Sequence, residues 1–135
     1  MTRYISRAEF WLLAELITEI DTQTLLRISR VDLADSALNA PAAWFEQDDF
    51  YPNLFDKAAV LACRIAWNHP LPDGNKRAAW VSLTMFVELN GGSWNAGQPQ
   101  VDDAVAAMIA VAGRTVDEKW LAEWLRQRIT FPAQT

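Results

Sequence analysis

The sequence predicts an all-α fold, a compact bundle of about six helices around two consecutive buried helices. Apolar residues recur three and four positions apart along most of the chain, the spacing that gives a helix one buried face. Capping signals and glycine or proline stops divide these segments from one another. Two successive segments, 54–67 and 75–89, are apolar on most of their circumference, so they are expected at the centre of the bundle.

The first helices are predicted from their ends. Ser6 and Glu9 form a capping box, in which the serine oxygen accepts a backbone N–H and the glutamate reaches back, and helical spacing then continues to about Ile20. A second, shorter helix is expected over residues 32–40, where a proline ends it. The aromatic and acidic stretch 42–51 lacks a regular period and is expected to be a loop or flap.

The two central helices flank a polar loop. Asn53 is a suitable N-cap for the third helix, which is predicted to continue through Trp67. The fourth helix is expected to begin near Gly74 or Asn75. It should stop at Asn90, because two glycines follow, a usual end for a helix.

Two further helices complete the predicted bundle. After a connecting loop at 93–99, the fifth is expected over 101–112, where a glycine follows. Thr115 and Glu118 form a second capping-box pattern, which predicts a sixth helix that reaches Ile129. Five tryptophans fall at helical spacing and are expected in the core: Trp11, Trp67, Trp80, Trp120 and Trp124.

The composition narrows the classes of function. A chain of 135 residues is expected to form one domain over residues 1–135. Its net charge of −5 argues against direct binding of nucleic acid, because such proteins usually carry a basic face. There is no signal peptide, and no apolar run approaches the roughly 18 residues that cross a bilayer, so we expect a cytoplasmic protein without a membrane partner. The single cysteine, Cys63, lies in an apolar segment and is expected to be buried and inert.

The strongest functional signal is the polar loop between the central helices, His69-Pro70-Leu71-Pro72-Asp73-Gly74-Asn75-Lys76-Arg77. His69 is the chain's one histidine and could act as a general base or as a capping cation at a helix end. Asp73 could hold Mg²⁺ through one carboxylate oxygen, cap the next helix, or do both. Gly74 lets the backbone turn close to a ligand, and Asn75 either orients the loop or occupies the first helical turn.

Two cations stand at the start of the fourth helix, where the helix dipole disfavours positive charge. Lys76 and Arg77 therefore need a compensating anion, and a bound polyphosphate would supply one. Pro70 and Pro72 stiffen the loop, which lowers the entropy cost of holding it ready. The ordered set indicates a site that binds a nucleotide with Mg²⁺ and activates a hydroxyl.

This loop resembles the signature of the Fic/Doc family, whose common form is H-P-F-x-[DE]-G-N-G-R. The lysine before the arginine is similar to the Doc branch, toxins of bacterial toxin–antitoxin pairs. The resemblance covers roughly residues 4–129 and includes further Doc-like segments at 33–38, 50–59, 86–91 and 121–125. It implies an all-α Fic/Doc-type fold with the loop between two central helices.

The resemblance also implies an activity, the transfer of part of a nucleotide to a protein hydroxyl. In most Fic proteins a glycine at the position of Lys76 leaves room for the phosphates, and AMP is transferred. In Doc-like proteins the lysine fills that space, and the γ-phosphate of ATP goes to a threonine of elongation factor Tu. The implied roles are catalysis by His69 as base with Asp73, Lys76 and Arg77, phosphate binding by Gly74, Asn75, Lys76 and Arg77, and Mg²⁺ binding by Asp73.

Three features bear on how such a protein would be rigidified, controlled and targeted. Leu71 replaces the family's usual phenylalanine, which predicts a less rigid loop. No string of the form [ST]-x-x-x-E-[GN], the mark of an internal inhibitory helix, is present. Inhibition is therefore expected from a cognate antitoxin whose disordered tail folds into a groove. Residues 44–51 either align the target, as the flap of Fic proteins does, or tuck Trp44 and Phe45 into the core.

The sequence leaves three functions open. A lysine beside the transferred phosphate adds positive charge, which favours a kinase that uses ATP and Mg²⁺ on a threonine of the translation machinery. The second is AMP transfer to a protein hydroxyl despite Lys76. The third is a non-catalytic binding module with a Fic fold, which the intact polar positions of the loop disfavour.

Overall fold

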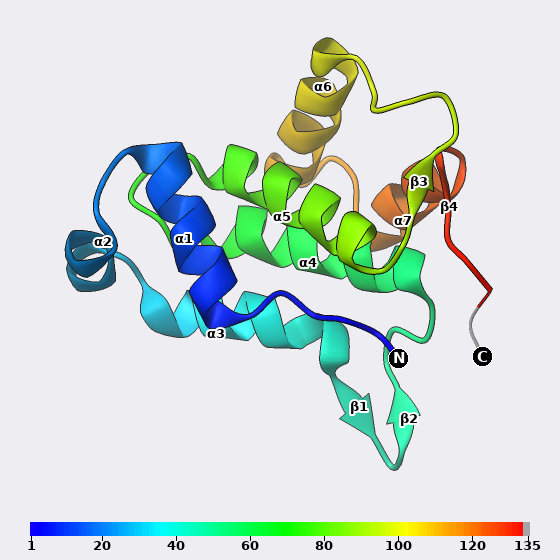
Figure 1. Ribbon diagram of the computed structural model, residues 1–135, viewed down its shortest axis with the longest axis horizontal. Helices are drawn as coiled ribbons and strands as arrows, with labels where there is room; N and C mark the ends of the chain where they lie inside the picture. The colour runs from blue at the N-terminus through cyan, green and yellow to red at the C-terminus, as the bar shows by residue number, and fades with distance from the viewer. Residues whose placement is uncertain (134–135) are drawn as a thin grey trace.

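Two antiparallel helices, α4 (Leu54–Asn68) and α5 (Asn75–Leu89), lie at the centre of the fold, as the sequence predicted (Figure 1). The computed structural model describes residues 1–133. Helix α4 packs against α5 and against three further helices. The other elements, in chain order, are α1 (Arg7–Thr18), α2 (Thr22–Ile28), α3 (Val31–Asn39), the 3₁₀ turn η1 (Ala40–Ala42), β1 (Trp44–Phe45), β2 (Asp48–Asp49), β3 (Ser93–Trp94), α6 (Val101–Ala112), α7 (Glu118–Arg126) and β4 (Ile129–Thr130).

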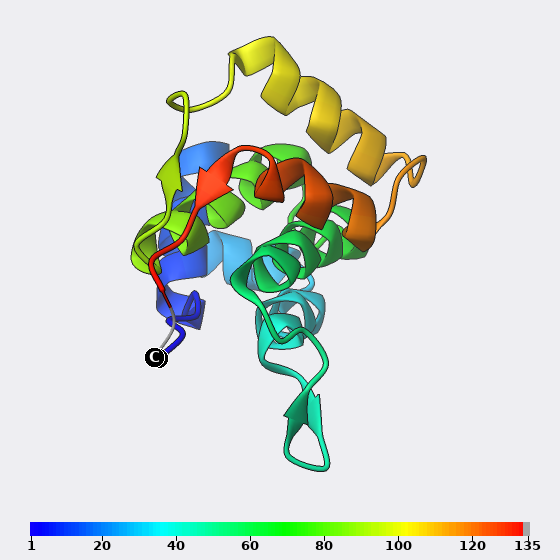
Figure 2. The ribbon, with the colours of Figure 1, turned by 90° about the vertical axis from the view of Figure 1, so that its right-hand side faces the viewer.

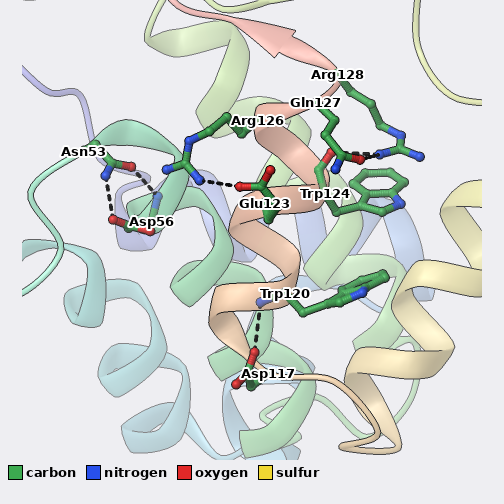
Figure 3. Close-up of polar contacts among 9 residues, drawn as sticks. All are labelled: Asn53, Asp56, Asp117, Trp120, Glu123, Trp124, Arg126, Gln127 and Arg128. Atoms are coloured by element: carbon green, nitrogen blue, oxygen red, sulfur yellow. Dashed lines mark hydrogen bonds and ion pairs between the residues drawn. The ribbon is translucent and has the colours of Figure 1, made fainter.

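Side-chain caps start α1 and α4 where the sequence placed them. The capping box at α1 is confirmed: Ser6 Oγ accepts from the Glu9 N–H at 3.1 Å, and Glu9 Oε1 accepts from the Ser6 N–H at 2.9 Å. Asn53 caps α4 by accepting from the Asp56 N–H at 2.9 Å (Figure 3). The predicted fifth helix is α6, with the expected bounds. Local hydrogen bonding therefore explains why the predicted starts of α1 and α4 hold, whereas α6 starts without a side-chain cap.

Helix α2 was not predicted from the sequence. Helix α2 is capped by Asp21, whose side chain accepts from the Thr24 N–H at 3.0 Å, and it brings the α-helices among residues 1–133 to seven rather than about six. It has seven residues, of which Leu25 alone is buried. A helix this short with one buried residue shows no amphipathic pattern, so spacing could not reveal it.

The last part of the chain departs from the prediction in two ways. Helix α7 is capped by Asp117, which accepts from the Trp120 N–H at 2.8 Å (Figure 3), and not by a capping box from Thr115, whose hydroxyl donates to the Ala110 carbonyl at 3.1 Å. The helix also ends at Arg126. Ile129 lies instead in β4, which pairs with β3 inside the expected connecting loop.

The tryptophans divide by depth rather than all lying in the core. Trp11 is buried, as expected. Trp67, Trp80 and Trp124 are half-buried, and the latter two pack edge to face at a centroid distance of 6.1 Å. Trp120 is 38% exposed, so the prediction that it belongs to the core is wrong. Its helix buries Leu121, Ala122 and Leu125, and that stripe leaves Trp120 at the edge.

Of the helices described, none combines the length and the apolarity that crossing a bilayer would require.

Candidate active site

The polar loop joins α4 to α5 at the end of the pair that lies beside α1 and α2 (Figure 1). His69 ends α4 in the left-handed region (φ 49°, ψ 56°), with its N–H donating to the Ile65 carbonyl at 3.3 Å. Gly74 precedes α5 in the same region (φ 78°, ψ 19°). These two left-handed residues turn the chain out of one helix and into the next. The His69 side chain is exposed and, among residues 1–133, has no hydrogen bond or ion pair.

The middle of the loop is pinned from inside. Leu71 is 4% exposed, so it fills an interior position despite being smaller than phenylalanine. Asn75, also buried, accepts from the Leu71 N–H and donates to the Leu71 carbonyl, both at 2.9 Å. Both interpretations from the sequence hold: Asn75 is the first residue of α5, and its amide bonds to the loop at Leu71. Its side chain is thus engaged with backbone, which leaves its N–H for any anion at the helix start.

Contacts from α1 and α3 hold the outside of the loop. A Cβ at Gly74 would lie 3.0 Å from Ile17 Cγ2, so α1 approaches at a distance that only glycine permits without adjustment. The Arg30 N–H donates to the Pro70 carbonyl at 2.8 Å. Asn68, the residue before His69, donates from Nδ2 to the Leu33 carbonyl at 3.0 Å. These contacts join residues far apart in sequence, and spacing analysis missed them.

The charged residues of the loop face solvent. Asp73, Lys76 and Arg77 are exposed, and none has a hydrogen bond or ion pair within the described chain. The first turn of α5 holds no acidic residue, and the backbone N–H groups of its first three residues have no helical partner. Two side-chain cations and unpaired N–H groups at one helix start favour an anion such as a phosphate.

A groove adjoins this cationic end. It has a volume of about 540 Å³ between α1 and α5, and Arg77 is one of its walls. Apart from Glu9, the other side chains that line it are apolar: Leu12, Leu13, Leu16, Ile17, Val81 and Met85. The structure thus shows an exposed imidazole at His69 and, separately, a groove with the Arg77 side chain in its wall.

Residues 44–51 form a hairpin that projects from the helical body (Figure 1 and Figure 2). Trp44 pairs with Asp49 and Phe45 with Asp48. Trp44 and Phe45 are 65% and 61% exposed, so the alternative that they tuck into the core is wrong. The hairpin comes before the first residue of α4, whereas the polar loop follows the last residue of this helix. A helix of 15 residues separates the two by about 22 Å, so the structure does not bring them together.

A buried lysine anchors the hairpin, and sequence analysis gave no sign of it. Lys57 is 2% exposed, and its Nζ lies 3.0 Å from the Pro41 carbonyl oxygen and 3.5 Å from Asp49 Oδ2. The same ammonium stands 5.5 Å from the centre of the Tyr4 ring. One side chain thereby ties η1, which precedes the hairpin, strand β2 and the N-terminal segment to α4.

The cysteine is confirmed as a buried residue. Burial, followed by the charge of Glu118, raises the pKa of the Cys63 thiol to about 12. A thiol with that pKa carries almost no thiolate near neutral pH, so it does not serve as a nucleophile. Nearby, Arg64 donates to Glu118 at 3.0 Å and to the Tyr51 hydroxyl at 3.3 Å, a polar cluster beneath the hairpin. Burial is also the largest cause that raises the pKa of Tyr51.

The fold and the site define a class of small helical domains that present a polar, cation-bearing loop between two antiparallel central helices. A sequence model of the Fic/DOC family matches residues 5–87, which include the whole loop. The chain is also 41% identical over 92 residues to a protein named Toxin Doc from Mycolicibacterium smegmatis (strain ATCC 700084 / mc(2)155), covering 68% of this chain and 70% of that protein. The chain therefore belongs to the Fic/Doc family, whose members typically use a nucleotide to modify proteins.

Proposed function

We propose that this protein is a Doc-like toxin that transfers the γ-phosphate of ATP to a threonine hydroxyl of a translation factor, elongation factor Tu by family resemblance. It would act in the cytoplasm, arrest translation and be neutralised by a cognate antitoxin. The observation that carries the proposal is that the loop exposes the His69 imidazole and, at the start of α5, two unpaired cations, Lys76 and Arg77. The similarity to Toxin Doc supports the Doc branch.

In the proposed reaction, His69 takes the proton of the target hydroxyl as its oxygen attacks the γ-phosphorus. The bond between that phosphorus and the β–γ bridging oxygen breaks, and ADP leaves. In this proposal, Lys76 and Arg77 balance the charge of the transferred group and the leaving phosphate. The backbone N–H groups at the start of α5 would hold further phosphate oxygens.

Asp73 is the candidate for the metal. Its carboxylate is exposed at the loop and engaged by no other side chain of residues 1–133. Within those residues no group of three or more His, Cys, Asp or Glu could hold a metal ion. A single carboxylate fits Mg²⁺ that arrives bound to ATP, because this ion commonly uses one or two carboxylates together with phosphates and water. When bound, Mg²⁺ would neutralise charge on the phosphates.

Labelled ATP tests the chemistry directly. The purified protein is incubated with a lysate and with ATP labelled at either the γ- or the α-phosphate. Label transferred from the γ position supports the kinase, and label transferred from the α position would show AMP transfer instead. Replacing His69 by asparagine, which tolerates the left-handed backbone, should lower the transfer rate by about 10²- to 10⁴-fold because the base is lost.

A variant of Lys76 tests whether this residue decides between phosphate transfer and AMP transfer. Lys76→Gly should weaken phosphate transfer and open space that permits AMP transfer. The matched control is Lys119→Gly, because Lys119 is also exposed and is also the second residue of its helix, α7. If Lys76→Gly behaves like Lys119→Gly in product and rate, this lysine does not select the chemistry.

Growth arrest separates an enzyme from a binding module. Expression of wild type should stop growth, and expression of His69→Ala should not. Equal toxicity of the two would favour binding without catalysis.

The apolar groove beside Arg77 is the surface that we assign to the antitoxin tail, because an amphipathic helix could lay its apolar face between α1 and α5. Leu16, which is 75% exposed, is a wall of this groove. Leu16→Asp should keep toxicity but escape rescue by the product of an adjacent small reading frame. Undiminished rescue would place the antitoxin elsewhere.

A further inference from the structure

We infer that Asn68 is a positioning residue for His69, and that a single turn of α3 sets the place of the catalytic base through it. The inference rests on the proposed function, in which His69 takes the proton of the target hydroxyl. Asn68 is the last residue of α4 and precedes His69 directly.

The His69 side chain has nothing of its own to hold it. The imidazole is exposed and has no hydrogen bond or ion pair within residues 1–133. Its backbone is left-handed at φ 49°, a region that only a few per cent of non-glycine residues occupy, although histidine is enriched there with asparagine and aspartate. Such a conformation persists only where the surrounding structure imposes it. The position of the imidazole therefore depends on what fixes the residues on either side.

Both neighbours of His69 are bonded to the start of α3. Asn68 Nδ2 donates to the Leu33 carbonyl at 3.0 Å, and the Pro70 carbonyl accepts from the Arg30 N–H at 2.8 Å. Arg30 is the N-cap residue of α3, and Leu33 lies in its first turn. The backbone of His69 is thus held at two points by one turn of a neighbouring helix.

Of these two bonds, only the one before His69 is made by a side chain. Proline has no N–H, so its carbonyl is the one polar backbone group that Pro70 can offer. The donor on the other side is the Asn68 amide, which reaches across 35 positions in the sequence rather than to a carbonyl of its own helix. Substitution at this residue can therefore remove one of the two points without touching the backbone.

Lys76 and Arg77 are expected to keep their positions when the hydrogen bond from Asn68 to the Leu33 carbonyl is lost. Lys76 and Arg77 lie on α5, after the separate clamp between Asn75 and Leu71. We therefore expect a split effect, in which the base is displaced and nucleotide binding is retained. A displacement of the base by about 1 Å is enough to slow catalysis by up to two orders of magnitude.

Two variants test this. Asn68→Ala removes the amide, and Asn68→Asp keeps its size but, when ionised, cannot donate to a carbonyl. In the labelled-ATP assay, kcat should fall by about tenfold or more in both, while KM for ATP changes by less than about twofold. The matched control is Asn53→Ala, which removes an asparagine hydrogen bond of 2.9 Å at the other end of the same helix. It should lower the melting temperature and leave kcat unchanged within about twofold.

A second measurement does not need activity. His69 is the one histidine of the chain, so an NMR spectrum contains a single histidine Cε1–Hε1 cross-peak. This peak should shift or broaden in both Asn68 variants and stay unchanged in Asn53→Ala.

The inference is overturned if Asn68→Asp keeps the wild-type kcat and the wild-type cross-peak. It is also overturned if kcat in Asn68→Ala falls no more than in the Asn53→Ala control. If the wild type transfers no label from either position, the proposed function fails, and the cross-peak comparison still decides whether Asn68 positions His69.

Discussion

Replacing Asn75 by alanine should destabilise the protein by about 2–4 kcal/mol. The Asn75 side chain makes both of its hydrogen bonds to Leu71, an N–H and a carbonyl that lie in a part of the loop that is almost completely buried. A buried donor or acceptor that loses its partner costs about 1–3 kcal/mol, so two give roughly 2–6 kcal/mol. We expect the lower part of that range because the loop can relax toward water.

Urea unfolding, followed by tryptophan fluorescence, measures this loss. The slope of the free energy against urea concentration should stay unchanged, since the surface exposed on unfolding is nearly the same. Asn39→Ala is the control, because Asn39 is exposed and has no side-chain hydrogen bond, and it should stay within about 0.5 kcal/mol of wild type. A loss below about 1 kcal/mol for Asn75→Ala would refute the clamp.

In the Asn75→Asp variant, the loss of stability relative to wild type should depend on pH. A protonated carboxyl can accept from the Leu71 N–H and donate to the Leu71 carbonyl, whereas an ionised one loses the second bond and faces the carbonyl oxygen with a charge. Folding therefore raises the pKa of the introduced carboxyl above its ordinary value of about 3.9. The deficit relative to wild type should be smallest below about pH 4 and grow as the pH rises through the raised pKa. A deficit of constant size would contradict the hydrogen-bond assignment.

Three further changes probe the scaffold. Gly74→Ala should cost at least about 1–2 kcal/mol in thermal unfolding, because φ is +78° and the new Cβ would lie 3.0 Å from Ile17 Cγ2; an unchanged melting temperature would argue against that close approach. Ser6→Ala should cost about 1 kcal/mol in urea unfolding by removing the α1 cap, and a negligible loss would mean that the cap adds nothing. Cys63 should react with a thiol reagent only after unfolding. Because burial and the Glu118 charge raise its pKa to about 12 from 9.0, the stability from the protonated thiol is complete below about pH 9 and lost as the pH rises through about 12.

Helix positions were largely readable from the sequence because they depend on neighbours along the chain. Capping residues and glycine stops act within four positions, so the starts of α1 and α4 and the bounds of α6 agree with the prediction. Helix α2 and the β3–β4 pair were not readable. The helix has a single buried residue, and the two strands are two residues long and are brought together by packing rather than by local pattern.

The candidate site also has features that the sequence predicts and features that only the structure shows. The residues of the loop were predicted together, since they are consecutive in the sequence. The bonds that shape the loop, from Arg30 to Pro70 and from Asn68 to Leu33, join distant segments and needed the structure. For Asn75 the sequence left open whether the amide orients the loop or the residue only occupies the first helical turn, and its two hydrogen bonds to Leu71 were visible only in the structure.

The length of α4 sets a minimum footprint for any single partner that touches both the hairpin and the loop. Its 15 residues span about 22 Å, which an extended peptide covers with about seven residues. Shorter synthetic substrates could therefore engage one end but not the other. A comparison of short peptides with a folded target would show whether the two ends of this helix are used in the same encounter.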